Sequence, residues 1–231
     1  MTLPQSPHGP QEEIASIARM PGEGCELPCH DVTPIPGTLA FPADLLANVV
    51  VSADKDRIPW WSPCESRPLD LPDDLERVRP GSRDKAAAAG RYRGAVGAGP
   101  ARLAVFDLDL RAEAGEDPDM ALMRIRPHGV AAVMYTSYGH GEPLDGGGSK
   151  VGAHAVVLLD RPCLPEEHAA VRHALCRRLF PDGQGGTLVD PRTAGVHHPY
   201  RVRSCHPDRL DMARCWLVEG PPASVDDARR R

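Results

Sequence analysis

The chain has 231 residues, a length that fits one ordinary domain with extended ends. A hydrophobic content of 41% is enough for a sizeable core, and because aromatic residues make up only 4%, that core must consist largely of alanine, valine and leucine. The formal net charge of −5 argues against a surface that binds nucleic acid non-specifically, although it leaves room for a local basic groove.

Hydropathy and cysteine usage indicate a reducing, aqueous environment. No apolar run approaches the roughly 20 residues of a membrane span, and the N-terminus lacks a signal pattern, so we expect a cytoplasmic protein without membrane contact. The seven cysteines are odd in number and irregularly spaced, which is typical of reduced thiols rather than of a disulfide framework. Cys25, Cys29 and His30 superficially suggest zinc, but no second ligand pair follows at the expected distance. Zinc is therefore the weaker alternative.

Composition divides the chain into segments. Residues 1–38 are rich in proline, glycine and acids without sustained periodicity, which predicts a flexible or wrapped N-terminal segment. We expect a single domain over residues 39–218, in which 39–100 is an N-terminal α/β module and 101–207 is the core. Residues 219–231 then form a C-terminal tail.

The N-terminal module carries two features with more than one interpretation. Trp60 and Trp61 lie between prolines that forbid a helix, so they either cap a core, which we favour, or offer a surface on which a base stacks. The basic residues that follow form either a solvated surface or a phosphate-facing wall. They are Arg77, Arg79, Arg83, Lys85, Arg91 and Arg93.

The clearest pattern in the chain is an apolar strand, predicted over residues 103–110, that carries two acids. Residues two apart in a strand point to the same face, so Asp107 and Asp109 project side by side while Phe106 and Leu108 point into a core. Two carboxylates held this close repel each other unless a cation lies between them. The strand therefore predicts a divalent metal.

The elements after this strand predict an α+β fold. They are a short helix after Asp117-Pro118, a strand at 130–136, a flexible loop at 137–150, a strand at 153–159, a helix from Pro165 and a short strand at 187–190. The order βαββαβ is that of the ferredoxin-like or RRM-like unit, whose sheet has the strand order 4-1-3-2. Both helices cover one face of that sheet, and we expect the other face to be free for function.

Four polar residues from distant parts of the chain are predicted to meet on that free face. Asp107 and Asp109 lie on the first strand, His154 lies on the neighbouring third strand, and Asp190 ends the strand on the other side. Carboxylates without a tight Cys/His set favour Mg²⁺ or Mn²⁺ over zinc. Two such ions can support phosphoryl transfer.

The segments next to these four residues suit a phosphate-rich ligand. Ser149, Lys150 and Gly152 precede His154 and offer a hydroxyl, an ammonium and close backbone approach. Arg201 and Arg203 alternate on an extended segment, where both can face the same phosphates. These five residues are candidate nucleotide-binding residues.

Three short motifs follow one another along the chain. They are Asp107-Leu108-Asp109 after an apolar run, Gly152-Ala153-His154 at the start of a strand, and Val189-Asp190. Together they resemble the motifs of the archaeo-eukaryotic primase (AEP) superfamily, and the chain looks like a primase-polymerase catalytic domain of the phage and plasmid type. The resemblance covers about residues 100–207.

This resemblance implies a template-directed nucleotidyltransferase, a DNA primase, a DNA polymerase or both. In the family, the acids that match Asp107, Asp109 and Asp190 bind two catalytic metals, and the histidine that matches His154 contacts the incoming nucleotide with Lys150 and Ser149. The implied partners are a DNA template and primer with (d)NTPs. A replicative helicase or other replication proteins of a mobile genetic element are further candidates.

Two other functions remain open at this point. One is a non-catalytic RRM-type nucleic-acid-binding replication module, which stacks bases on aromatics of its central strands. The acids, and the inward direction expected for Phe106, disfavour it. The other is a metal-dependent phosphohydrolase or nuclease that uses the same ligands.

Overall fold

The computed structural model describes residues 13–18, 32–36, 49–58, 60–92, 94–180, 189–190 and 193–230. Several sequence predictions fall on other residues and lie outside these ranges. They concern Cys25, Cys29, His30, Arg93 and residues 187–188.

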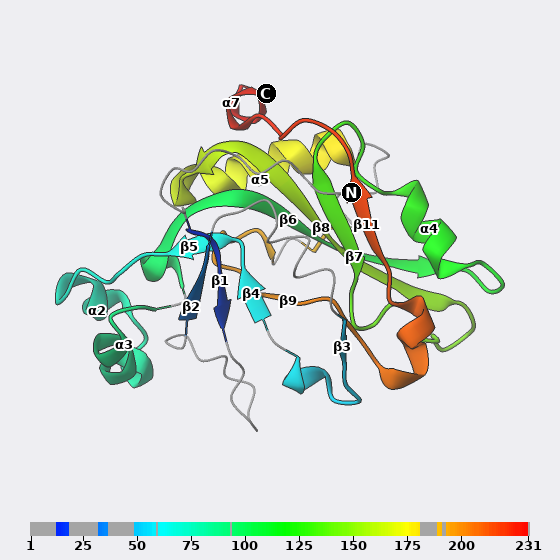
Figure 1. The fold of residues 1–231 in the computed structure, drawn as a ribbon, viewed down its shortest axis with the longest axis horizontal. Coiled ribbons are helices and arrows are strands. Elements are labelled where there is room, and N and C mark those ends of the chain that lie inside the picture. Colours follow the sequence, from blue (N-terminus) through cyan, green and yellow to red (C-terminus); the bar gives the residue numbers. More distant parts are fainter. Residues whose placement is uncertain are drawn as a thin grey trace.

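A five-stranded antiparallel sheet forms the centre of the fold (Figure 1), in the order β11-β7-β8-β6-β5. Its strands are β5 (Cys64–Ser66), β6 (Ala98–Ala112), β7 (Ala132–Thr136), β8 (Ser149–Cys163) and β11 (Cys215–Val218). The predicted first and third strands, β6 and β8, are central neighbours, and the predicted second strand, β7, flanks β8. The predicted α+β class is confirmed.

Smaller sheets flank the central one. Strands β1 (Glu13–Ala18), β2 (Val32–Pro36), β4 (Trp60–Ser62) and β9 (Tyr200–Arg201) form a sheet in the order β2-β1-β4-β9, and β3 (Val50–Val51) pairs in parallel with β10 (Ser204–Cys205). Parts of the expected N-terminal segment therefore form strands.

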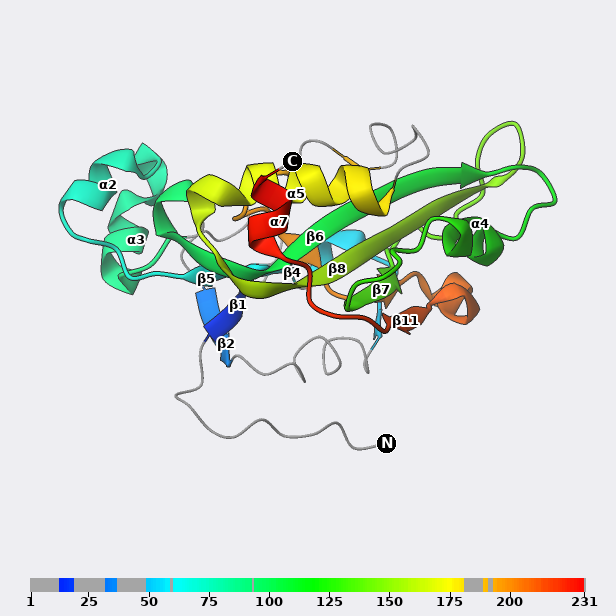
Figure 2. The ribbon, with the colours of Figure 1, turned by 90° about the horizontal axis from the view of Figure 1, so that it is seen from above.

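The helices are short except for one. They are α2 (Asp73–Arg77), α3 (Arg83–Ala89), α4 (Pro118–Arg124), α5 (Pro165–Leu179) and α7 (Val225–Arg229), with 3-10 turns η1 (Lys55–Arg57), η2 (Pro80–Ser82), η3 (Ala95–Gly97) and η5 (Pro207–Met212). α4 begins where the sequence predicts, because Asp117 accepts a hydrogen bond from the Asp119 amide and Pro118 occupies the first turn. Figure 2 shows α5 lying across β6 and β8.

Both predicted helices pack on the same side of the sheet. On β6, Phe106 and Leu108 are fully buried in a cluster that also holds Leu122 of α4 and Leu175 of α5. Alternation along β6 turns the residues between them to the opposite side. This is the predicted arrangement of helices and core.

The opposite face of the sheet is only partly free, which corrects the sequence prediction. Leu103 and Val105 point to this face and pack with Ile58, Trp61 and Tyr200 in a second buried cluster. β6 is apolar on both sides up to Phe106, so an exposed face there would leave apolar side chains in water. The face becomes polar only from Asp107 onward.

The predicted fourth strand is reduced to one bridge in the part that the structure describes. Val189 pairs antiparallel with Leu108, on the edge of β6 where the fourth strand was expected. β5 pairs with the N-terminal half of the same edge, through Ala98 and Ala101. No sequence pattern predicted β5.

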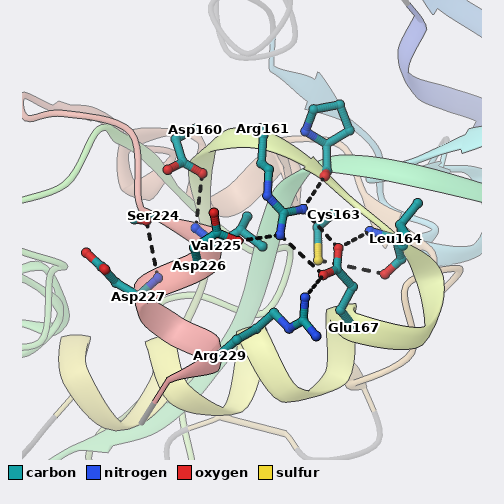
Figure 3. Close-up of polar contacts among 11 residues, drawn as sticks. Asp160, Arg161, Cys163, Leu164, Glu167, Ser224, Val225, Asp226, Asp227 and Arg229 are labelled. Atoms are coloured by element: carbon teal, nitrogen blue, oxygen red, sulfur yellow. Dashed lines mark hydrogen bonds and ion pairs between the residues drawn. The ribbon is translucent and has the colours of Figure 1, made fainter.

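A network of charged groups holds the C-terminal helix α7 against β8 and α5 (Figure 3). Glu167, whose side chain is 8% exposed, accepts hydrogen bonds from the Leu164 amide at 2.9 Å, from Arg161 at 3.0 Å and from Arg229 at 2.8 Å. Arg161 also pairs with Asp226 of α7 at 2.7 Å. These bonds, Arg161 first, lower the pKa of Glu167 to about 2.

The structure also bears on the hydropathy prediction. Within the described ranges, no helix combines the length and the apolar character that crossing a membrane requires.

We expect the Glu167→Gln variant to be less stable by about 2 kcal/mol, because the largely buried Glu167 side chain loses the charge that binds its two more exposed arginine partners. The folded pKa near 2 lies below the ordinary value of 4.5, so the charge stabilises the fold above pH 4.5 and this stability is lost as the pH falls toward 2. Urea unfolding of both proteins at several pH values measures the difference, which should disappear in that window.

Asp226→Asn provides the control. Its carboxylate is half exposed and pairs only with Arg161 in this network, so the variant should lose less than Glu167→Gln at neutral pH. Equal losses, or a Glu167→Gln loss that persists unchanged at pH 2, would contradict the assignment of Glu167 as the centre of the network.

Candidate active site

A cavity of about 470 Å³ opens where the polar half of β6 meets β8, β9 and the segment around Asp190. Its lining residues are Lys55, Trp60, Asp107, Leu108, Asp109, Ser137, Tyr138, Gly139, Lys150, His154, Asp190, Thr193, His198, Pro199, Tyr200 and Arg201.

Strand pairing brings the four residues that the motifs single out to this one cavity. Asp107 lies opposite His154 in the register of β6 and β8, with 3.5 Å between Asp107 Oδ1 and His154 Nε2. Asp109 lies opposite Gly152. The Asp190 amide donates to the Asp107 carbonyl at 3.1 Å. The convergence inferred from the sequence is thus present in the geometry.

The Ser137 hydroxyl lies close over Gly152, beside Asp109. A Cβ placed on Gly152 would lie 2.3 Å from Ser137 Oγ, so a larger residue here requires this side chain to rotate away.

His154 is buried between two aromatic rings. The Tyr135 and Tyr200 rings lie 5.0 and 5.5 Å from its centroid, both edge-on. Burial lowers the pKa of His154, the Asp107 carboxylate opposes that effect, and Arg201 and Lys55 add to it. His154 is therefore a neutral imidazole at pH 7, able to donate or accept a hydrogen bond without adding positive charge.

Three cations line the same cavity. Lys150 Nζ lies 3.4 Å from Asp109, and Arg201 pairs with Asp56 at 3.3 Å while its guanidinium stacks 4.1 Å above the Trp60 ring. Burial lowers the pKa of Lys55, and the positive charges of Arg201 and Lys150 lower it further. Repulsion among cations held this close favours an anionic ligand between them.

Trp60 and Trp61, which the sequence predicts either to cap a core or to form a stacking surface, differ in their environment. Trp61 is 2% exposed, packs in the second core cluster and donates from Nε1 to the Tyr135 hydroxyl at 3.0 Å. Trp60 is only partly buried and lines the cavity beside Arg201. The preferred core role therefore describes Trp61, whereas Trp60 belongs to the site.

Some candidate residues lie away from the cavity lining. Ser149 pairs with Ala112 at the far end of the β6–β8 ribbon, and Arg203 Nη2 donates to the Ala213 carbonyl at 2.7 Å. None of the described members of the basic stretch lines the cavity either, so the phosphate-facing wall is not found there. Most of this stretch belongs to α2, α3 and their flanks, which Figure 1 places at the opposite end of the molecule from α4.

Sequence reasoning missed several lining residues, namely Lys55, Tyr138, Thr193, His198 and Tyr200. The adjacent pair His197-His198 was a visible signal, because two histidines follow soon after Asp190. The others occupy loops, a 3-10 turn or short strands with no period, so only the tertiary structure places them.

The oxygen donors of the cavity suit a hard divalent cation. Asp107, Asp109 and Asp190 all line it, and Mg²⁺ is usually held by one or two carboxylates together with substrate phosphates and water. Across the residues that the structure describes, no three His, Cys, Asp or Glu side chains lie close enough to enclose a metal by themselves. The donor set fits Mg²⁺ or Mn²⁺ completed by phosphate ligands, and it does not fit a closed tetrahedral zinc site.

Comparisons with known proteins give one structural likeness to report. No protein-family model matches the chain, and a search of curated proteins finds no match. Among solved structures, the chain is similar to the AEP domain of the primase-polymerase (PrimPol) of cyanophage S-2L, with 9% sequence identity and a TM-score of 0.46. The likeness covers 94% of this chain and 88% of that chain. Neither value assigns an activity to this chain.

The hydrogen bonds behind His154 lead to a stability prediction. The buried Tyr135 hydroxyl accepts from Trp61 Nε1 and donates to the Arg201 carbonyl at 2.9 Å. Tyr135→Phe removes both of these buried hydrogen bonds, so we expect a loss of about 2–3 kcal/mol in the free energy of unfolding. Urea denaturation followed by tryptophan fluorescence measures it.

Tyr138→Phe is the matched control. Its hydroxyl reaches the carbonyls of Ser52 and Ala53 at 3.1 Å, in a more exposed position. Water can replace these bonds, so this variant should lose less than about 1 kcal/mol. A Tyr135→Phe protein as stable as Tyr138→Phe would show that the buried hydroxyl does not hold the Arg201 backbone.

Proposed function

We propose that the chain is a template-directed nucleotidyltransferase that acts as a DNA primase, a DNA polymerase or both. The observation that carries this proposal is the composition of one cavity. Three carboxylates and a neutral histidine lie beside Lys55, Lys150 and Arg201. A phosphoryl-transfer site combines carboxylates that bind metal ions with lysine and arginine side chains that bind phosphates.

The acids would hold two Mg²⁺ or Mn²⁺ ions through Asp107, Asp109 and Asp190. When bound, such ions activate an attacking hydroxyl and stabilise the leaving oxygens of a phosphoryl group. Asp109, whose carboxylate lies 3.4 Å from Lys150 Nζ, would exchange this ion pair for a metal. Lys150 would then be available to a phosphate oxygen.

The remaining residues would bind and orient the nucleotide. His154, neutral and fixed between two tyrosine rings, would hydrogen-bond the incoming nucleotide without repelling a metal. Lys150, Arg201 and Lys55 would contact its phosphates from the cavity wall. The template and primer would be DNA, with a helicase or other mobile-element replication proteins as further partners.

The RRM-type alternative meets an obstacle in the fold. Such modules stack bases on exposed aromatics of the central strands. Phe106 is fully buried on the helix side of β6, and Tyr135 of β7 is buried in the second core cluster. A hydrolase or nuclease would use the same ligands, and the products of the reaction separate it from a polymerase.

Incorporation of labelled dNTPs or NTPs on a template, with and without a primer and with Mg²⁺ or Mn²⁺, tests the proposal. We expect the wild-type chain to extend a strand and Asp107→Ala to lose at least roughly 100-fold in rate, because a metal ligand is removed. Asp84→Ala, an exposed acid on α3 outside the cavity lining, is the control and should remain fully active.

Two results would count against the proposal. Full activity of Asp107→Ala would exclude the acid as a metal ligand. Metal-dependent release of phosphate or nucleoside monophosphate without strand growth would instead identify a hydrolase that uses the same cavity.

A further inference from the structure

A buried arginine on the helix side of the sheet reaches the segment that carries Asp190. Arg172 of α5 is only 5% exposed. Burying a guanidinium is costly unless its donors are bonded. Its Nε donates to the Val105 carbonyl at 2.9 Å, and its Nη2 donates to Thr193 Oγ1 at 2.7 Å.

Thr193 passes this contact on to Asp190. Its hydroxyl accepts from Arg172 and donates to the Asp190 carbonyl at 2.7 Å, and its amide donates to the same carbonyl at 3.1 Å. Because a guanidinium can only donate, Arg172 turns the lone pair of the hydroxyl toward itself and the hydrogen toward Asp190. The three groups therefore have one consistent donor order.

The same hydrogen-bond network also contacts β6, the strand that carries Asp107. Val105, the other acceptor of Arg172, lies two residues before Asp107 on β6. The Tyr200 hydroxyl donates to the Thr193 carbonyl at 2.9 Å and lies 3.3 Å from the Val105 carbonyl. The Asp190 amide also donates a hydrogen bond to the Asp107 carbonyl. Arg172 thus links the two backbone segments that carry Asp107 and Asp190.

We propose that Arg172 and Thr193 are positioning residues that hold Asp190 in register with Asp107 and so set the affinity of the acids for a divalent metal. This inference rests on the proposed metal-binding role of the acids. Arg172 does not line the cavity and acts through Thr193. Outer contacts of this kind orient carboxylate ligands and commonly change metal affinity by roughly 10- to 100-fold.

A local positioning role and a general contribution to stability have different signatures. Thr193→Val removes the hydroxyl and keeps the shape, Thr193→Ser restores the hydroxyl, and Arg172→Met removes the donor. Glu167→Gln weakens the same helix α5 at a side chain that bonds Leu164, Arg161 and Arg229 and not Thr193 or Val105, which makes it the control for lost stability.

The first measurement is amide hydrogen exchange of the peptide that spans Asp190, without any metal. We expect exchange there to be faster in Thr193→Val and in Arg172→Met, and close to wild type in Thr193→Ser and in Glu167→Gln. Should Arg172→Met fail to fold, Thr193→Val and its serine partner decide the question. Wild-type exchange in Thr193→Val would overturn the proposal.

The second measurement is a titration with Mn²⁺ alone, followed by the electron paramagnetic resonance signal of the free ion. We expect Thr193→Val to raise the Kd roughly tenfold and Thr193→Ser to stay within about twofold of wild type. An unchanged Kd in Thr193→Val, where Asp190→Asn weakens binding, would overturn the positioning role alone. An unchanged Kd in Asp190→Asn would overturn the metal role of Asp190 on which both proposals depend.

Discussion

The pairing of β6 with β8 is the constraint on which the rest of the site depends. The register sets Asp107 against His154 and Asp109 against Gly152, and a slip of one residue would turn both acids into the helix-side core. That slip is opposed by Phe106 and Leu108, which are fully buried on the helix side. Core packing and site geometry thus both follow from the alternation of apolar and acidic side chains between the two faces of β6.

The second core cluster explains why the site lies at one end of the sheet. Ile58, Trp61 and Tyr200 cover the apolar half of the face opposite the helices, and the cavity begins where β6 turns polar. The covering residues also shape the site, because Tyr200 and Tyr135 enclose His154 and remove it from water. Burial keeps the imidazole neutral, which suits a hydrogen-bonding role beside metal ligands.

Local patterns were enough to predict the acids of β6, because alternation in one strand decides which way Asp107 and Asp109 point. The helices α4 and α5, the α+β class and the adjacency of β6 and β8 followed from periodicity and element order, whereas α7 lies in the segment expected to be a tail. The cover of the second face could not be predicted, since it depends on β4 and β9, which are short and far apart in the chain. The position of Arg203 could not be predicted either. Its spacing from Arg201 suggests a shared phosphate-binding role, but its guanidinium donates to the Ala213 carbonyl.

The central claim is that the acids of this cavity bind divalent metal together with a nucleotide. Anomalous diffraction from crystals soaked with Mn²⁺ and a non-hydrolysable nucleoside triphosphate tests it most directly. We expect manganese between the carboxylates of Asp107 and Asp109, with the triphosphate beside Lys150 and Arg201. A bound nucleotide elsewhere on the protein, with no manganese at these acids, would contradict it.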